Sequence, residues 1–132
     1  MTYDEMGEQG NRSRKRLGVW GEGYAVRLLE DKGYEIVARN WRWGRKGEVD
    51  IVARDGEVLV FVEVRTRRGK RAGTPAESLT VRKQQKLYQL VQAYLMTHEL
   101  GEVACRLDLV GIEVDERGRL IRCNHFENVL QT

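Results

Sequence analysis

Cysteine and histidine are scarce in this chain of 132 residues, which contains two of each. Cys105 and Cys123 match no Cys-x-x-Cys spacing, and His98 and His125 have no partner at the spacing of metal ligands. The sequence therefore argues against a thioredoxin-like redox motif and a Cys/His zinc site. We expect two buried free thiols in a reducing cytosol and histidines that are structural or exposed.

Long apolar runs and a strong charge of one sign are also missing. No run approaches the roughly 20 apolar residues that span a bilayer, and Met1–Arg16 has no apolar segment of the kind that a signal peptide needs. We therefore expect a cytoplasmic protein with no membrane partner. The 23 basic residues face 20 acidic ones, and the net charge of +3 does not by itself predict a nucleic-acid partner.

The apolar patterns predict a helix, three strands, a second helix and two strands. Residues 1–16 carry few apolar side chains, which predicts a flexible basic tail before a single domain over residues 17–132. Helical spacing begins at Leu17, and Thr80 is placed to cap a second helix, after a short helical turn at Thr74–Glu77. The predicted strands cover residues 34–41, 48–54, 57–66, 106–114 and 120–124. This order predicts an α/β fold with a mixed central sheet flanked by helices.

The second and third predicted strands form the clearest local signal. They are separated by Asp55-Gly56, a pair that favours a tight two-residue hairpin turn. Counting back from this turn places Asp50 diagonal to Glu63, and strict alternation puts Glu48, Asp50, Glu63 and Arg65 on one face.

Three acids at one end of a hairpin repel one another, and partial burial makes the repulsion worse. A hard divalent cation with oxygen ligands would offset it. Alternatively, the hairpin end is simply solvated, and Arg65 and nearby bases neutralise the acids. The pattern alone leaves both interpretations open.

The segments 47–53 (Gly-Glu-Val-Asp-Ile-Val-Ala) and 60–66 (Val-Phe-Val-Glu-Val-Arg-Thr) resemble the YraN family of uncharacterised bacterial proteins. Gly21-Glu22 and Arg106-Leu107-Asp108 belong to the same resemblance, which covers about residues 17–130. That family is similar to archaeal Holliday-junction resolvases and to the wider restriction-endonuclease-like fold. The resemblance therefore implies a restriction-endonuclease-like, mixed five-stranded sheet.

The resemblance also implies a site for Mg²⁺ or Mn²⁺. Asp50, Glu63 and the backbone carbonyl of Val64 would be the ligands, Glu48 a further acid, and Glu22 the acid from the first helix. A metal held in this way polarises a phosphate and lowers the pKa of an attacking water.

Arg65 and Gln84 also correspond to positions with a role in related nucleases. Arg65 stands where nucleases of this fold have lysine; an arginine stays charged and cannot take a proton, but it can bind a phosphate and stabilise negative charge. Lys46 and Lys83 are candidates to replace that lysine in space. Gln84, with Tyr88 one turn later, resembles a helical motif that supports the active site of RecB-type nucleases, although an ordinary helix face is the alternative.

Basic residues gather in three runs around the acids, and this arrangement suits a phosphate backbone. We expect the nucleic acid to be DNA, and the expected contacts with it are Arg42, Arg45, Lys46, Arg67, Arg68, Lys70, Arg71 and Lys83. The leading hypothesis is a divalent-metal-dependent endonuclease acting on branched or structured DNA. The alternatives are a catalytically weak or inactive DNA-binding module of the same fold, and an interaction or assembly protein. Because resolvase-like relatives are symmetric dimers, a homodimer is compatible with the first two.

Overall fold

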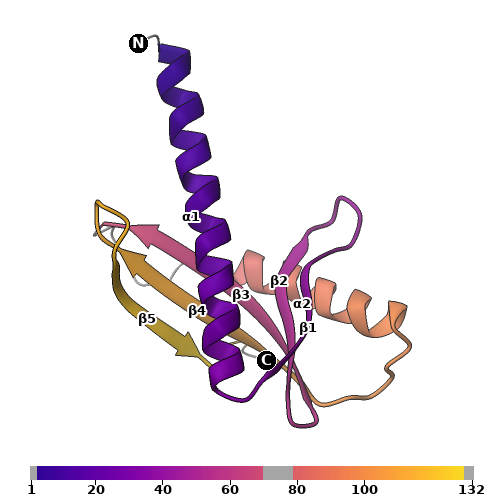
Figure 1. Cartoon of the computed structure of the whole chain (residues 1–132). Coiled ribbons are helices and arrows are strands. Elements are labelled where there is room, and N and C mark those ends of the chain that lie inside the picture. The colour runs from indigo at the N-terminus through magenta and orange to yellow at the C-terminus, as the bar shows by residue number, and fades with distance from the viewer. Residues whose placement is uncertain (1–2, 70–78, 130–132) are drawn as a thin grey trace.

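The computed structural model describes residues 3–69 and 79–129. It contains a five-stranded sheet in the order β1-β2-β3-β4-β5, in which only β3 and β4 are parallel among neighbouring strands (Figure 1). The predicted α/β fold with a mixed five-stranded sheet is thereby confirmed, and it is the arrangement of a restriction-endonuclease-like core. The elements are α1 (Tyr3–Asp31), β1 (Glu35–Arg42), β2 (Glu48–Asp55), β3 (Val58–Arg68), α2 (Val81–Thr97), β4 (Cys105–Val114) and β5 (Leu120–Phe126).

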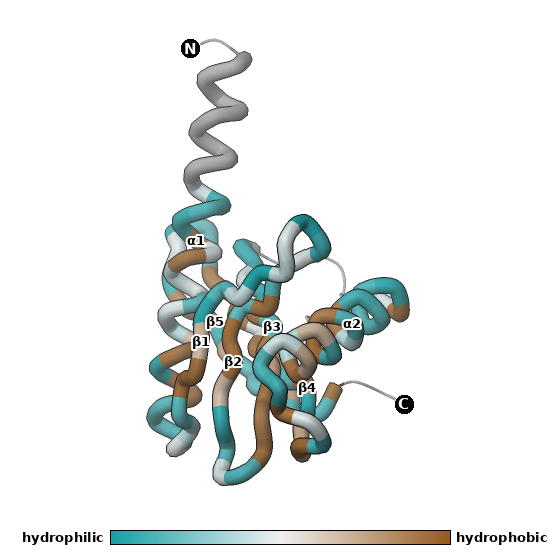
Figure 2. Tube along the Cα trace, turned by 90° about the vertical axis from the view of Figure 1, so that its right-hand side faces the viewer, coloured by the Kyte–Doolittle hydropathy of each residue, from teal (hydrophilic) through white to brown (hydrophobic). Residues whose placement is uncertain are grey.

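The two helices cover opposite faces of the sheet, so the molecule has three layers (Figure 2). Under α1, Ala25 and Leu29 pack with Ile51, Val62 and other residues of the sheet, which we call the α1 cluster. Under α2 lies the α2 cluster, which contains Val49, Val52, Leu59, Phe61, Leu87, Leu90, Val91 and Tyr94. Because β3 and β4 run in the same direction, the chain has to cross over between them, and α2 is part of that crossover.

The helix boundaries agree with the sequence at α2 and differ from it at α1. The Oγ1 atom of Thr80 accepts a hydrogen bond from the backbone N–H of Lys83 at 3.3 Å, so the predicted N-cap is confirmed. By contrast, α1 begins at Tyr3 rather than at Leu17, and its first turns extend past the end of the sheet (Figure 1). The flexibility of residues 1–16 stays a prediction, and the short turn expected at 74–77 lies outside the described residues.

No helix within residues 3–69 and 79–129 is long and apolar enough to span a membrane. Cys105 and Cys123 are free, as predicted, but the expected burial was wrong, because Cys105 is exposed at the start of β4 and Cys123 of β5 is half-buried.

The β2–β3 hairpin has a different register from the predicted one. Asp55 pairs with Val58, so Gly56 and Glu57 form the turn, and Gly56 takes a positive φ of 62°. The predicted turn, Asp55-Gly56, was therefore wrong by one residue. The pairing slides by two residues, and the last pair, Ile51 with Val62, makes Asp50 and Glu63 the next residues along the two strands.

Helix α1 approaches β3 most closely at Gly21. A Cβ atom at this position would lie 3.1 Å from Cβ of Thr66 and still closer to its Oγ1, so a side chain here forces a shift of the helix or of Thr66. Glycine is unfavourable within a helix, by about 1 kcal/mol relative to alanine. Its presence is explained by this contact, which fixes the next residue, Glu22, against the sheet.

We predict that Gly21→Ala lowers the free energy of unfolding by about 1–3 kcal/mol, because overpacking outweighs the gain in helix propensity. Gly23→Ala is the matched control in the same helix, since a Cβ atom there would meet nothing within 4 Å. It is expected to stabilise the protein slightly. Urea unfolding of both variants measures the difference, and equal effects would contradict the close contact.

Strand β4 holds a buried carboxylate, Asp108, which pairs with Val62 of β3 and whose exposure is 0%. Its oxygens accept hydrogen bonds from Nε of Arg106 at 3.0 Å, Nε2 of His125 at 2.7 Å and the backbone N–H of Asn128 at 3.0 Å. The Nζ atom of Lys32 lies 2.9 Å from Nδ1 of His125 and is a donor only, so the hydrogen on the ring is at Nε2, facing Asp108. This network joins α1, β4, β5 and the chain after β5. His125 is therefore structural, as predicted.

Burial alone would raise the pKa of Asp108, but hydrogen bonds from His125, Arg106 and Asn128 outweigh it and hold the pKa below the usual value. Since the folded pKa is lowered, the contribution of Asp108 to stability is present above the unfolded pKa of about 4 and is lost as the pH falls through the folded pKa.

We predict that Asp108→Asn lowers the free energy of unfolding at neutral pH by about 3 kcal/mol, because it removes the buried charged acceptor and leaves Arg106 only its ion pairs with the more exposed Asp55 and Glu127. Thermal unfolding at neutral and acidic pH measures this, and the difference from the unmodified chain should shrink at acidic pH. Asp31→Asn, at an exposed position of α1, is the control. A variant that unfolds like the control at neutral pH would contradict the role of the network.

Candidate metal centre

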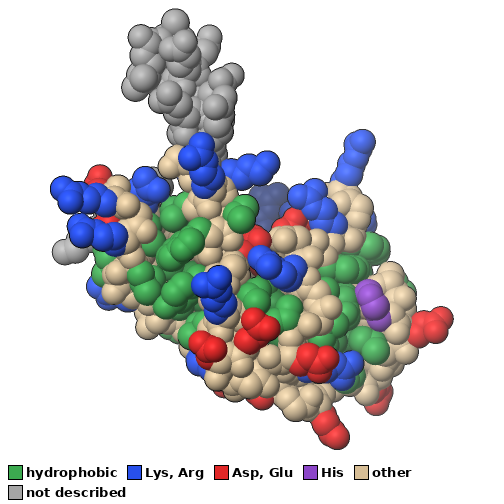
Figure 3. Space-filling model, viewed as in Figure 1, with side chains coloured by type: hydrophobic (Ala, Val, Ile, Leu, Met, Phe, Trp, Pro, Cys, Tyr) green, Lys and Arg blue, Asp and Glu red, His purple; other side chains and the backbone are tan. Residues whose placement is uncertain are grey.

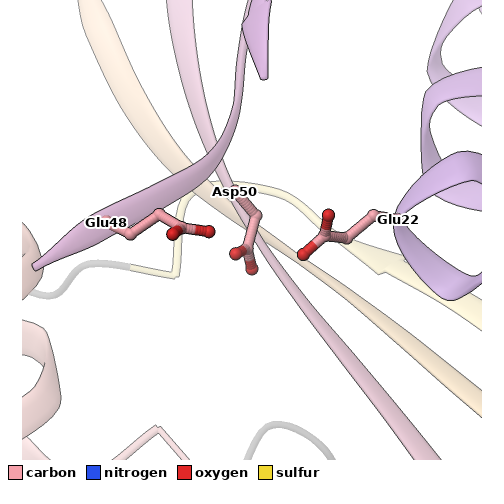
Figure 4. Close-up of side chains that lie close together, drawn as sticks. All are labelled: Glu22, Glu48 and Asp50. Carbon is pink, nitrogen blue, oxygen red and sulfur yellow. The ribbon is translucent and has the colours of Figure 1, made fainter. Parts of the chain in front are cut away.

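Four acids from three elements meet where β2 begins. Glu22 comes from α1, Glu48 and Asp50 from β2, and Glu63 from β3. Carboxylate oxygens of Glu22, Glu48 and Asp50 all lie within 4.8 Å of one another, and the three side chains point toward a common centre (Figure 4). The structure thus brings together the acids that the sequence singled out.

Asp50 reaches this centre because β2 does not alternate regularly. Val49 and Val52 both pack in the α2 cluster although they are three positions apart, whereas Ile51 packs in the α1 cluster. The phase of the strand therefore changes at Asp50, and its carboxylate lies on the α1 side, next to Glu22. The sequence placed Asp50 on the same face as Val52, and that assignment was wrong.

The Asp50 carboxylate is mostly buried, and few hydrogen-bond donors offset the cost of burying its charge. Its Oδ2 atom accepts a hydrogen bond from the backbone N–H of Val64 at 2.8 Å, and its side chain also hydrogen-bonds that of Glu63. A hydrogen bond between two carboxyl groups requires a shared proton. Accordingly, burial and then the charge of Glu63 raise the pKa of Asp50 to about 8, against the opposing effect of the Val64 N–H. The Val64 carbonyl as a metal ligand stays a prediction.

The positively charged side chains of Arg65 and Lys83 lie near Glu63. Nη2 of Arg65 lies 3.0 Å from its Oε1. Burial raises the pKa of Glu63, and the charge of Arg65, the hydrogen bond with Asp50 and the charge of Lys83 act in the opposite direction. Lys83 in the first turn of α2 is therefore close enough to influence the site, while Arg65 is in direct contact with it.

The acids open into a pocket of about 330 Å³ beside α1. Its lining joins the helix to the ends of β2 and β3 and consists of Arg14, Leu17, Gly18, Glu22, Asp50, Glu63, Val64, Arg65 and Thr66. Arg14 is a basic residue at this pocket that the sequence interpretation assigned to the tail. Arg14 reaches the pocket because α1 continues toward the N-terminus beyond Leu17.

Other predicted residues lie at the edges of the site or away from it. Nε of Arg42 is 2.9 Å from Oε2 of Glu48, and Nζ of Lys46 lies over the ring of Trp43 at 5.2 Å. Gln84 is not brought to the acids: its Nε2 donates to the carbonyl of Leu79 at 3.0 Å, and it lines a separate pocket.

A functional residue that the sequence analysis missed is Asn40 of β1. Its Nδ2 donates to Oε2 of Glu22 at 3.1 Å and to Oε1 of Glu48 at 2.9 Å. The signal in the sequence was weak, because a single asparagine in a strand carries no motif. Its position before the acidic strand becomes meaningful only once β1 and β2 are paired.

The topology collects basic residues at this end of the sheet. Strands β1, β3 and β4 all run toward it: Arg42 at the end of β1 pairs with Glu48, and β3 continues from Glu63 to Arg67 and Arg68. In Figure 3 blue side chains gather at the upper end, around the base of the projecting helix, and red ones at the lower end. Of the predicted contacts, Arg42, Arg45, Lys46, Arg67, Arg68 and Lys83 lie in these segments, and Lys70 and Arg71 lie outside the described residues.

The same acids fall within a stretch of sequence shared with other proteins. Residues 21–112 match the model of the Uncharacterised protein family UPF0102, a range that contains Glu22, Glu48, Asp50 and Glu63. The chain belongs to the UPF0102 family. This is the YraN family of the resemblance, which is therefore confirmed.

UPF0102 proteins from distant bacteria resemble the chain over most of its length. One from Symbiobacterium thermophilum is 47% identical over 114 residues, covering 86% of this chain and 95% of its own. One from Roseiflexus castenholzii is 48% identical, with coverages of 86% and 91%, and one from Streptomyces coelicolor is 43% identical, with coverages of 80% and 82%. None of these names states a reaction, so the function of this UPF0102 chain is argued from the site.

We predict that Asp50→Asn stabilises the metal-free UPF0102 chain at about pH 8, by on the order of 2 kcal/mol, since one pKa unit corresponds to about 1.4 kcal/mol and partial exposure weakens the effect. The folded pKa is raised, so the penalty is absent below the unfolded pKa, grows as the pH rises from about 4, and is complete above the folded pKa.

Urea unfolding in the presence of a chelator, at acidic and at mildly alkaline pH, measures this difference. The gain over the unmodified chain should disappear at acidic pH, and Asp31→Asn again serves as the control. Destabilisation by Asp50→Asn at mildly alkaline pH would show that the carboxylate is well compensated in the folded chain.

Proposed function

We propose that this protein is a divalent-metal-dependent endonuclease that hydrolyses phosphodiesters in branched or structured DNA. The observation that carries the proposal is the convergence of Glu22, Glu48, Asp50 and Glu63, from three elements, on one pocket that basic segments surround. Membership of the UPF0102 family is compatible with it, and the resemblance to resolvases supports it.

The residues present fit a hard divalent cation. All four acids offer carboxylate oxygens, the ligands that Mg²⁺ and Mn²⁺ prefer. The raised pKa of Asp50 indicates a group that lacks a compensating positive charge. Asp50 and Glu63 would hold the ion, with Glu48 and Glu22 beside them. When bound, such an ion polarises a phosphate and lowers the pKa of a water.

The chain's own residues supply the rest of the chemistry. Arg65 contacts Glu63 and is one third exposed, so its guanidinium both orients that carboxylate and faces the pocket where a phosphate would lie. A guanidinium there stabilises negative charge that develops on the phosphate. Because it does not release its proton, Arg65 takes no part in proton transfer.

The basic segments around the pocket would bind phosphates on either side of the scissile one. Phosphate contacts position a nucleic acid without reading its sequence, so the recognised feature is the shape of the DNA. Branched DNA brings two backbones close together, and the basic ends of β1, β3 and the first turn of α2 lie on different sides of the acids.

We predict metal-dependent cleavage of labelled four-way junctions, flaps or other structured DNA, and loss of the rate by at least about 100-fold in Glu63→Gln, the order of effect expected when an electrostatic catalytic group is removed. The reactions contain Mn²⁺ or Mg²⁺, with a chelator in parallel. Glu113→Gln is the matched control, because Glu113 is an ion-paired acid on the neighbouring strand β4.

Each result decides between defined functions. Cleavage that survives Glu63→Gln would place the activity outside this site. DNA that is bound in a salt-sensitive way but never cut would favour a binding module of the same fold, for which Arg65 in place of lysine is the reason. If the protein neither binds nor cuts DNA, the interaction or assembly hypothesis remains, and the oligomeric state in solution is then the property to measure.

A further inference from the structure

Asn40 has an unusual backbone conformation for a strand residue. Its φ is 52°, in the left-handed region that side chains other than glycine rarely adopt. Asparagine tolerates this region better than most residues, yet the conformation still costs energy. Such a conformation inside β1 needs a compensating interaction.

The conformation changes the phase of β1. Ala38 and Trp41 both pack against the α2 cluster although they are three positions apart, so the alternation breaks between them, where Asn40 lies. Arg39 pairs with Ile51 and Trp41 with Val49, which places Asn40 opposite Asp50, the point where β2 changes phase too.

The side chain of Asn40 uses this geometry to join two acids from different elements. Its single Nδ2 group donates one hydrogen bond to Glu22 of α1 and another to Glu48 of β2, at 3.1 and 2.9 Å. These are two of the three carboxylates that come within 4.8 Å of one another. An amide N–H group between two carboxylates reduces their repulsion by hydrogen bonding.

The same side chain suits a bound cation as well. Turning the amide about its last bond exchanges the nitrogen for the oxygen with no change of shape. An amide oxygen is a ligand for hard cations or for the waters around them. Asn40 is exposed to solvent, so the amide is free to turn.

We propose that Asn40 is a positioning residue of the metal centre: its amide N–H group holds Glu22 and Glu48 together in the metal-free chain, and its amide oxygen faces the cation or a water on it when the cation is bound. This inference rests on the proposed metal centre, and it assigns a role to a residue that neither the sequence motifs nor the family resemblance singled out.

Two substitutions separate the side chain from the backbone. Asn40→Gly removes the amide and accepts a φ of 52° without strain, which Asn40→Ala does not. Asn40→Asp keeps the size and the tolerance for this φ but replaces the donor group by an oxygen. Binding of Mn²⁺ is measured by calorimetry, and thermal unfolding is measured in a chelator, so that neither measurement depends on cleavage.

For Asn40→Gly we expect Mn²⁺ affinity to fall by about tenfold, the lower end of the effect of residues that orient metal ligands. For Asn40→Asp we expect opposite changes in the two measurements. The metal-free chain unfolds at a lower temperature, because another carboxylate joins the acids, whereas Mn²⁺ binds more tightly, because the charge of the ligands increases. If Asn40 had only a structural role, Asn40→Asp would lower both the unfolding temperature and the Mn²⁺ affinity.

The chain provides matched controls. Asn128 has the same φ of 52°, and its backbone N–H donates to Asp108, a bond that glycine keeps, so Asn128→Gly controls for a glycine in this conformation. Asn124→Asp adds a carboxylate to an exposed position of β5. Neither control is expected to change Mn²⁺ affinity.

Unchanged Mn²⁺ affinity in Asn40→Gly, or weaker binding in Asn40→Asp, overturns the proposal. If the unmodified chain binds no Mn²⁺ in a manner that Asp50→Ala abolishes, the proposed metal function fails by itself. The unfolding measurement then still decides the metal-free part: Asn40→Asp must lower the unfolding temperature more than Asn124→Asp, and equal effects reject the role of Asn40 in holding the acids.

Discussion

The mutual repulsion of carboxylates under partial burial is the constraint around which one end of this sheet is organised. Each acid is balanced by a different donor: Asp50 by the Val64 N–H, Glu63 by Arg65, and Glu22 and Glu48 by Asn40, with Arg42 also on Glu48. These donors are single hydrogen bonds or partly exposed ion pairs, which contribute little each. They hold the acids in place without saturating their oxygens, so a stronger positive charge can replace them.

A second carboxylate of the sheet, Asp108 of β4, is compensated differently. Asp108 is fully buried and receives hydrogen bonds from a guanidinium, an imidazole and a backbone N–H, and its pKa is lowered, whereas the pKa of Asp50 is raised. A buried carboxylate with a complete set of donors stabilises the fold, and one with an incomplete set is a candidate for ligand binding. Two aspartates in neighbouring regions of the same sheet thus differ in role because they differ in the donors around them.

The order of the elements, the mixed sheet and the identity of the acids could be predicted from the sequence, because periodicity and the family resemblance each rest on many residues. The prediction failed where a single backbone angle decides which face a side chain lies on. Strict alternation placed Asp50 on the face of Val52, and the left-handed φ of Asn40 with the matching phase change in β2 reverses that. The hairpin register failed because Gly56 can occupy either position of a two-residue turn. Gln84 was misplaced since helix periodicity does not state which pocket a polar side chain faces.

Strand direction explains how a chain with a net charge of only +3 can present a basic face. Since the crossover through α2 makes β4 parallel to β3, and β1 runs the same way, the three strands end at the same end of the sheet. Arg42 ends β1 beside Glu48, and β3 continues past Glu63 to Arg67 and Arg68. The turn that joins β2 to β3 lies at the other end, with Asp55 on Arg106. Charge is therefore segregated along the strands. Because electrostatic attraction acts over about one Debye length, roughly 8–10 Å in physiological salt, a phosphate backbone responds to this local excess and not to the net charge.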